Sequence, residues 1–174
     1  NAGLNITGIN AEVCIGQWEY QLFGMGALRA CDHLMLSRYL LFRAAENFDL
    51  NIELHPKPVQ GDWNGSGCHI NFSNPHIREV GGEESIKEIC DKFGARHDEH
   101  IEVYGSSNDM RLTGLHETQH ISKFSYGVSD RGASIRIPVQ TVADGWKGYL
   151  EDRRPSSNVD PYLAVTAIVE TLEG

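Results

Sequence analysis

Hydrophobic and polar positions alternate with a period of about two near the N-terminus. Residues 5–13 and 17–22 are short runs rich in β-branched and aromatic side chains, and they are separated by a break at Ile15-Gly16. Two such runs with a glycine-containing break between them are typical of paired strands. The pattern predicts a β-hairpin.

Longer segments show helical spacing instead. Over residues 29–48, apolar side chains recur at every fourth position, at Leu36, Leu40, Ala44 and Phe48. This spacing predicts a long amphipathic helix. A similar stripe predicts a second helix over residues 83–104, in which His97 and His100 are interpreted as packing residues, and residues 160–171 are expected to form a last helix.

Four more segments read as strands, at residues 68–73, 125–130, 134–138 and 148–152. They lie in hairpin-like pairs and do not alternate strictly with helices, which favours an antiparallel α+β domain over a parallel sheet. We expect a curved antiparallel sheet backed by helices, with a site at its concave face. At 174 residues the chain is expected to form one domain, residues 1–174.

Charge and cysteine content narrow the class of protein. The formal net charge is -9 and the 15 Lys and Arg residues are spread along the chain, so we expect no nucleic-acid partner and no binding to anionic membrane. The four cysteines show no C-x-x-C pair and no zinc spacing, which indicates free thiols in a reducing compartment. We therefore expect a cytoplasmic protein, with an organelle as the alternative location.

Two glutamates occur inside the apolar runs of the expected hairpin, Glu12 and Glu19. A buried, unpaired carboxylate there would carry a desolvation penalty of several kcal/mol, which a metal ion could offset. The alternative is that each glutamate faces solvent on an alternating strand.

A glycine-rich loop and one histidine form the second candidate site. Residues 61–67 contain three glycines, and His69 follows directly. Such a loop implies unusual backbone angles or the close approach of a ligand. His69 is a candidate ligand, although a lone histidine is more often a hydrogen-bonded structural residue.

Acidic and basic side chains crowd together in residues 148–155, either as a functional site or as a structural ion-pair knot. Arg111, Arg131 and Arg136 lie in glycine-flanked segments, where they would bind carboxylate or phosphate unless they form surface ion pairs. Oxygen-rich ligands with one histidine and no thiolate partner favour Mg²⁺ or Mn²⁺. The residues together predict metal-assisted phosphoryl transfer.

These segments resemble the eukaryotic-type glutamine synthetases in content and in order. The matching motifs are residues 10–13, 17–21, 61–69, 111–114, 116–118, 130–138 and 149–158. The resemblance covers nearly the whole chain, and so many long motifs in one order are highly specific. It implies the catalytic-domain fold of that family.

The resemblance also implies roles for individual residues. Two divalent ions, Mg²⁺ or Mn²⁺, would be held by Glu12 with Glu19 and by His69 with Glu151. The residues implied to bind glutamate are Arg111, Arg153, Trp63, Asn64 and Gly65. Those implied to face ATP are Arg131, Arg136, Asn71, Phe72, Ser73 and Tyr149. Glu117 would be the flap residue that closes the site and accepts a proton, and Arg131 and Arg153 would assist catalysis.

The implied reaction joins ammonia to the γ-carboxylate of glutamate. ATP first forms γ-glutamyl phosphate, and ammonia then displaces phosphate to give glutamine. The alternatives are a ligase for a larger amine and an inactive structural or assembly module of the family. The family's upstream Glu-x-Glu strand and small β-rich domain are not found in this sequence, so we expect the chain alone not to sustain catalysis. The expected partner is another copy, in a homo-oligomer of stacked rings.

Overall fold

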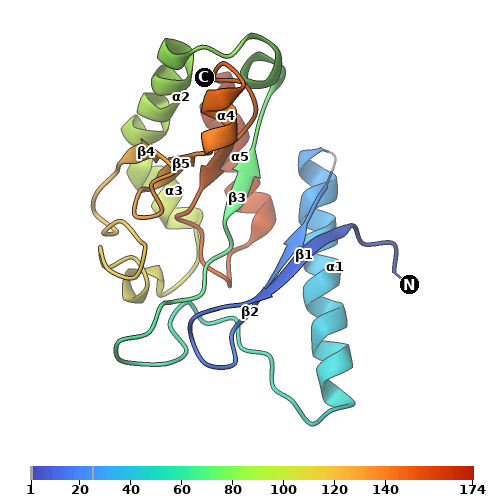
Figure 1. Cartoon of the computed structure of the whole chain (residues 1–174). Helices are drawn as coiled ribbons and strands as arrows, with labels where there is room; N and C mark the ends of the chain where they lie inside the picture. Colours follow the sequence, from blue (N-terminus) through green and yellow to red (C-terminus); the bar gives the residue numbers. More distant parts are fainter. Residues whose placement is uncertain (1, 25) are drawn as a thin grey trace.

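The computed structural model describes residues 2–24 and 26–174. Figure 1 shows a hairpin and a long helix, α1, standing beside a small sheet that carries the other helices. The C-terminal helix α5 contacts α1, α2 and α3 and so joins the two parts. None of the helices in the described residues is long and apolar enough to cross a membrane.

The hairpin is present as predicted. Strand β1 (Ile6–Ala11) pairs antiparallel with β2 (Trp18–Leu22), in a register that places Asn10 opposite Glu19. The turn between the strands buries Cys14, and the structure has all four cysteines as free thiols.

Helix α1 (Ala27–Glu46) also agrees with the predicted helix, but most of its apolar stripe is exposed. The helix is held by polar contacts. Tyr20 on β2 shares a 2.8 Å hydrogen bond with Ser37, and Arg38 donates to the carbonyls of Ser157 and Val159 at 2.8 Å each.

The four-stranded sheet contains β3 (Ile70–Phe72), β4 (Tyr126–Val128), β5 (Ile135–Ile137) and β6 (Leu150–Asp152), in the order β3-β6-β5-β4. The pairs β3/β6 and β5/β6 are antiparallel as expected, whereas β4 and β5 run parallel. The connection at 129–134 makes this pairing possible because it returns the chain to the start of β4. Ser129 adopts a left-handed conformation at φ 54°, and the Asp130 carboxylate accepts the Gly132 N–H at 2.8 Å.

The predicted second helix is in fact two helices, α2 (Glu83–Ala95) and α3 (His97–Val103). The chain bends at Arg96, whose guanidinium donates to Thr171 on α5 at 3.1 Å. Helix α5 (Pro161–Glu173) begins at Asp160, whose carboxylate caps the N–H groups of the first turn. Three short helical elements were not predicted: the π-helical turn η1 (His76–Val80), the 3₁₀ turn η2 (Asn108–Met110) and α4 (Val139–Ala143).

The main core lies between one face of the sheet and helices α2 and α5. The rings of Phe72 on β3 and Phe93 on α2 stack with centroids 4.8 Å apart. The core residues are Phe72, Ile77, Ile86, Cys90, Phe93, Ile135, Ile137, Leu150 and Ile168. The opposite face of the same strands is left free for polar side chains.

Candidate active site

Strands β3, β6 and β5 carry a row of polar side chains on the face away from the core. Asn71 lies opposite Glu151, and Glu151 lies opposite Arg136. Because side chains alternate along a strand, His69 and Arg153, two residues from Asn71 and Glu151, continue the same face. We call this row of five residues the polar strand face.

Glu151 is the centre of the polar strand face. One of its carboxylate oxygens lies 3.4 Å from Nδ1 of His69, both lie 3.4 Å from Nη1 of Arg153, and Nε of Arg136 donates to the other. Burial opposes ionisation, but His69, Arg153 and Arg136 together lower the pKa of Glu151 to about 2. His69 keeps 30 % of its side chain exposed, and its partial burial with the Arg153 and Arg111 charges lowers its pKa below 6.5. At neutral pH the pair is a carboxylate beside a neutral imidazole.

Arg153 connects this carboxylate with a surface loop. Its Nε donates to the carbonyl of Arg131 at 2.9 Å, and its Nη2 donates to the carbonyl of Glu117 at 3.4 Å. The Glu117 carboxylate lies 3.7 Å from Arg131, and both of these side chains are more than 60 % exposed. Glu117 and its neighbour His116 have φ values of 59° and 53°, a left-handed conformation that is uncommon for residues with side chains.

The loop that carries Glu117 has a closed base, and we call residues 113–120 the flap. The N–H of Ile121 donates to the carbonyl of Leu112 at 2.9 Å, and the Thr118 hydroxyl donates to the carbonyl of Arg111 at 3.2 Å. The tip of the flap is exposed at Leu115. Glu117 thus lies on an exposed loop bonded to Arg153 of the polar strand face, and its role as the residue that closes the site and accepts a proton stays a prediction.

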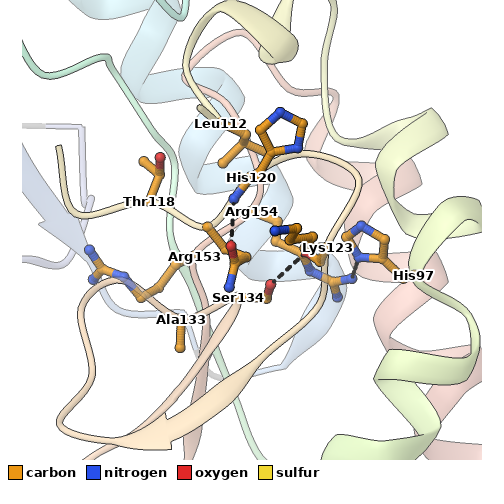
Figure 2. Close-up of a pocket in the computed structure, with 10 residues that line it drawn as sticks. His97, Leu112, Thr118, His120, Lys123, Ala133, Ser134, Arg153 and Arg154 are labelled. Carbon is orange, nitrogen blue, oxygen red and sulfur yellow. Dashed lines mark hydrogen bonds between the residues drawn. The ribbon is translucent and has the colours of Figure 1, made fainter. Parts of the chain in front are cut away.

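A small cavity lies behind the flap (Figure 2). Its volume is about 10 Å³, which is room for one water molecule. Its walls are formed by His97, Leu112, Thr118, Gln119, His120, Lys123, Ala133, Ser134, Arg153 and Arg154. The cavity separates the end of the flap from the segment that follows β6.

Arg111 does not present its guanidinium to an open site. Only 4 % of the residue is exposed, and Nη2 donates to the carbonyls of Arg153, Arg154 and Pro155 at 2.8, 3.1 and 2.8 Å. Burial, followed by the charge of Arg153, lowers the pKa of Arg111 to about 10. In this arrangement both terminal nitrogens of Arg111 donate to the backbone after β6, and the role of Arg111 in binding glutamate stays a prediction.

At two positions in the glycine-rich loop, a side chain would collide with Arg111. A Cβ at Gly65 would lie 2.5 Å from Cγ of Arg111 and 2.6 Å from the carbonyl of Pro56, and a Cβ at Gly67 would lie 3.1 Å from Nη2 of Arg111. Gly61 has φ 95°, which favours glycine. Gly65 and Gly67 therefore make room for Arg111, whereas Gly61 supplies the unusual backbone angle that was one of the two expectations for this loop.

Two buried polar atoms in and next to this loop have no hydrogen-bond partner in the part of the chain that the structure describes. Trp63 is partly exposed, and its carbonyl accepts a hydrogen bond from the buried Lys57. Asn64 Oδ1 and Arg111 Nε are buried without a hydrogen-bond partner among the described residues. Buried polar atoms are normally paired, so a bound molecule or water could complete them.

Glu12 and Glu19 lie on the hairpin, at the same end as the glycine-rich loop. Glu12 accepts from the Asn10 side chain at 2.7 Å, and the neighbouring Gln17 donates to the carbonyl of Gly65 at 3.3 Å. Both glutamates are half-buried. The described residues contain no group of three or more metal-ligating side chains, so the structure does not bring these two glutamates into a cluster with the pair of His69 and Glu151.

The residue types at the pair of His69 and Glu151 suit a divalent cation, but their surroundings carry positive charge. One carboxylate faces two guanidinium groups, those of Arg136 and Arg153. The excess positive charge favours an anion, and a phosphate would offer oxygens both to the arginines and to a cation. The residues therefore fit a divalent ion that binds together with phosphate.

The residues expected to face a nucleotide are divided between the two faces of the sheet. Asn71 and Arg136 lie on the polar strand face, but Phe72 is buried in the core, so its side chain cannot line the same site. Tyr149 is partly exposed, while the Ser73 hydroxyl donates to the carbonyl of Gly148 at 2.6 Å.

A buried network on the core side was not recognised as such from the sequence. Asp152 and Arg154 pair at 2.7 Å, and the Tyr104 hydroxyl donates to Asp152 at 2.6 Å. His97 lies 3.1 Å from Arg154. The crowded segment 148–155 thus contains both a site and a structural ion pair, on alternate residues.

Polar side chains on one face of a sheet, a flap and convergent arginines define an α+β domain suited to bind carboxylate or phosphate groups. Comparison with known proteins agrees. The family model described as "Glutamine synthetase, catalytic domain" matches residues 1–82. The chain is 56% identical over 170 residues to glutamine synthetase of Hebeloma cylindrosporum, covering 98% of this chain and 48% of that protein. It is 55% identical over 173 residues to that of Yarrowia lipolytica, covering 99% of this chain and 47% of that protein.

A solved structure supports the fold. The cryoEM structure of Plasmodium falciparum glutamine synthetase matches with a TM-score of 0.77 at 22% identity, over 97% of this chain and 34% of that chain. The chain spans about half the length of the curated relatives it matches. The chain belongs to the glutamine synthetase family.

Proposed function

We propose that this chain supplies catalytic residues of a glutamate-ammonia ligase, which makes glutamine from glutamate and ammonia at the expense of ATP. The observation that carries the proposal is the arrangement of Arg136 and Arg153 around the Glu151 carboxylate, with Arg153 also bonded to the flap at Glu117. One cluster of fixed guanidinium groups thus lies between a candidate cation ligand and a candidate proton acceptor.

The reaction needs two transfers. The γ-carboxylate of glutamate attacks the γ-phosphorus of ATP, ADP leaves, and γ-glutamyl phosphate forms. Ammonia then attacks the acyl carbon, phosphate leaves, and Glu117 accepts the proton released from nitrogen. Arg131 and Arg136 are suited to bind the transferred phosphoryl oxygens, and Arg153 to stabilise charge on the reacting carboxylate.

Divalent ions, Mg²⁺ or Mn²⁺, would supply positive charge that neutralises the phosphoryl oxygens. His69 and Glu151 would hold one ion, with a neutral imidazole and an ionised carboxylate as donors. Glu12 and Glu19 would hold a second. Trp63, Asn64 and Gly65 are proposed to line the glutamate site. The nucleotide would lie along Asn71 and Tyr149.

We also propose that the active form is a cytoplasmic homo-oligomer. Support comes from large apolar side chains that are exposed along the hairpin and α1, including Ile9, Trp18 and Phe42. Large apolar side chains that are exposed together are typical of interaction surfaces. Free cysteines agree with a reducing compartment.

The test is an assay of glutamine formation dependent on ATP, glutamate and ammonium, with the full-length protein that contains this sequence. Glu117→Ala should spare ATP binding and lower turnover by about a hundredfold or more, since a positioned acid or base contributes roughly 10²- to 10⁴-fold. Leu115→Ala, at the exposed flap tip, is the matched control and should retain activity. Preference for a larger amine over ammonium, or unchanged turnover in Glu117→Ala, would contradict the proposal.

A companion experiment concerns the 174-residue chain alone. His69 with Glu151 offers two groups to an ion that seeks about six ligands, so binding of Mg²⁺ or Mn²⁺ should be weak. Since a misplacement of roughly 1 Å can cost about a hundredfold in rate, glutamine formation by the chain alone should fall below detection. Turnover equal to that of the full-length protein would show that the chain is self-sufficient.

A further inference from the structure

We infer that His97 is a positioning residue that fixes the base of the flap to the buried segment after β6. The inference rests on the proposed function, because it assigns His97 the task of keeping Glu117 closed over the acyl phosphate. His97 lies on α3, far along the chain from the flap, and its side chain is buried.

Ile121 is the residue at which the flap closes. Its N–H donates to the carbonyl of Leu112 at 2.9 Å, so it joins the two ends of the flap. Its carbonyl lies 2.8 Å from Nε2 of His97. A single residue, Ile121, therefore carries both the bond that closes the flap and the bond that fixes it to α3.

The partners of His97 determine its tautomer. Arg154 Nη1 lies 3.1 Å from Nδ1 of His97 (Figure 2), and a guanidinium can only donate, so Nδ1 must accept. The Ile121 carbonyl can only accept, so Nε2 must carry the proton. His97 thus joins a donor on one side to an acceptor on the other, and it does so as a neutral ring.

Arg154 in turn connects His97 to strand β6, which carries Glu151. Arg154 donates to Asp152 through Nε at 2.9 Å and through Nη2 at 2.7 Å. Asp152 and Arg154 are the sequence neighbours of Glu151 and Arg153, which lie on the opposite face. The position of the flap base is therefore set against the same strand that carries Glu151.

Packing around His97 also holds the chain in place just after the flap. The ring of Phe124, three residues beyond Ile121, lies edge-on to the His97 ring with centroids 5.9 Å apart. The Arg154 guanidinium lies 5.3 Å from the centroid of Phe124. A Cβ at Gly94 would lie 2.9 Å from Phe124, so glycine is needed there to admit the ring. The chain beyond the flap is thus held in a fitted pocket, while the flap tip stays exposed.

Two substitutions separate the two bonds of His97. An asparagine side chain can place its oxygen where Nδ1 accepts, but it is too short to reach Ile121. A glutamine side chain can place its amide nitrogen where Nε2 donates, so His97→Gln keeps the flap bond and His97→Asn loses it. Each variant loses one hydrogen bond. The bond lost in His97→Gln comes from a charged guanidinium, so the melting temperature of His97→Gln should fall at least as much as that of His97→Asn.

The first measurement is the ratio of glutamine formed to phosphate released in the full-length protein. His97→Asn should lower glutamine turnover by about tenfold, within the range for a misplaced catalytic group, and should lower the ratio, because an open flap lets water attack γ-glutamyl phosphate. That side reaction returns glutamate and phosphate. The KM for ATP should stay unchanged, and His97→Gln should resemble the wild type in its ratio.

The second measurement is amide hydrogen exchange over residues 112–124, which does not depend on activity. The Ile121 amide should exchange faster in His97→Asn than in His97→Gln. Equal exchange and equal ratios in the two variants would show that His97 only fills the core, and the inference would be overturned. The wild type could make no glutamine while amide exchange still differed between the two variants. The proposed function would then be wrong, but the role of His97 in fixing the base of the flap would be supported.

Discussion

The pH dependence of stability should reveal the charge of Glu151. Its pKa falls from 4.5 to about 2 on folding, and only 8 % of its side chain is exposed. A carboxylate with a lowered pKa stabilises the folded state fully above pH 4.5, and this contribution is lost as the pH falls towards 2. Glu151→Gln removes the titration but keeps the shape of the side chain.

The magnitude follows from the two pKa values. The fall in the pKa of Glu151 from 4.5 to about 2 contributes roughly 3 kcal/mol to the free energy of unfolding at pH 7, and about 1 kcal/mol of this contribution remains at pH 3. The difference in free energy of unfolding between wild type and Glu151→Gln should therefore shrink by about 2 kcal/mol between pH 7 and pH 3.

Urea unfolding of the purified chain, followed by tryptophan fluorescence at several pH values, measures this difference directly. Groups without a contact to Glu151 titrate equally in both proteins and cancel in the comparison. The titration of His69, which contacts Glu151, is separated by repeating the pair of measurements in a His69→Gln background. A difference that stays constant from pH 7 to pH 3 would show that His69, Arg153 and Arg136 do not hold Glu151 ionised, and the account of the polar strand face would be wrong.

Three other substitutions test the neighbourhood. Gly65→Ala should lower the free energy of unfolding in urea by about 1–3 kcal/mol through overpacking, whereas Gly132→Ala, whose Cβ would meet only the Asp130 carboxylate at 3.3 Å, should cost little. Asp152→Leu should cost about 3–5 kcal/mol, and the double variant with Arg154→Met should recover most of it in a double-mutant cycle. Arg111→Lys should lower the melting temperature and raise the KM values of glutamate and ATP alike, because a lysine ammonium does not reproduce the planar guanidinium fork that binds these carbonyls. A rise in the KM of glutamate alone would favour direct binding of glutamate.

The sequence pattern predicted the helices and strands that are determined by residues close together in the chain. The hairpin, α1 and α5 follow from periodicity and from turn and cap residues near in sequence. The break at Arg96 depends instead on a hydrogen bond to Thr171, 75 residues away. The parallel pairing of β4 with β5 depends on a connection whose backbone conformation is not visible in its composition.

The candidate site was predicted as a set of residue types but not as a geometry. Strands of three residues are too short to show alternation, so the sequence could not tell that Glu151 faces the site while Asp152 faces the core. It also could not show that Arg111 is held by carbonyls contributed by residues 153–155. Such facts depend on which segments meet in space.

Strand β6 joins stability to function because its successive side chains serve opposite faces. Glu151 and Arg153 form the polar strand face, whereas Asp152 and Arg154 are buried and paired behind it. Breaking the buried pair would leave one charge uncompensated, and the backbone that positions Glu151 would have to move with it. Since catalysis is sensitive to displacements smaller than those that unfold a domain, variants of Asp152 should lose activity at temperatures where they remain folded.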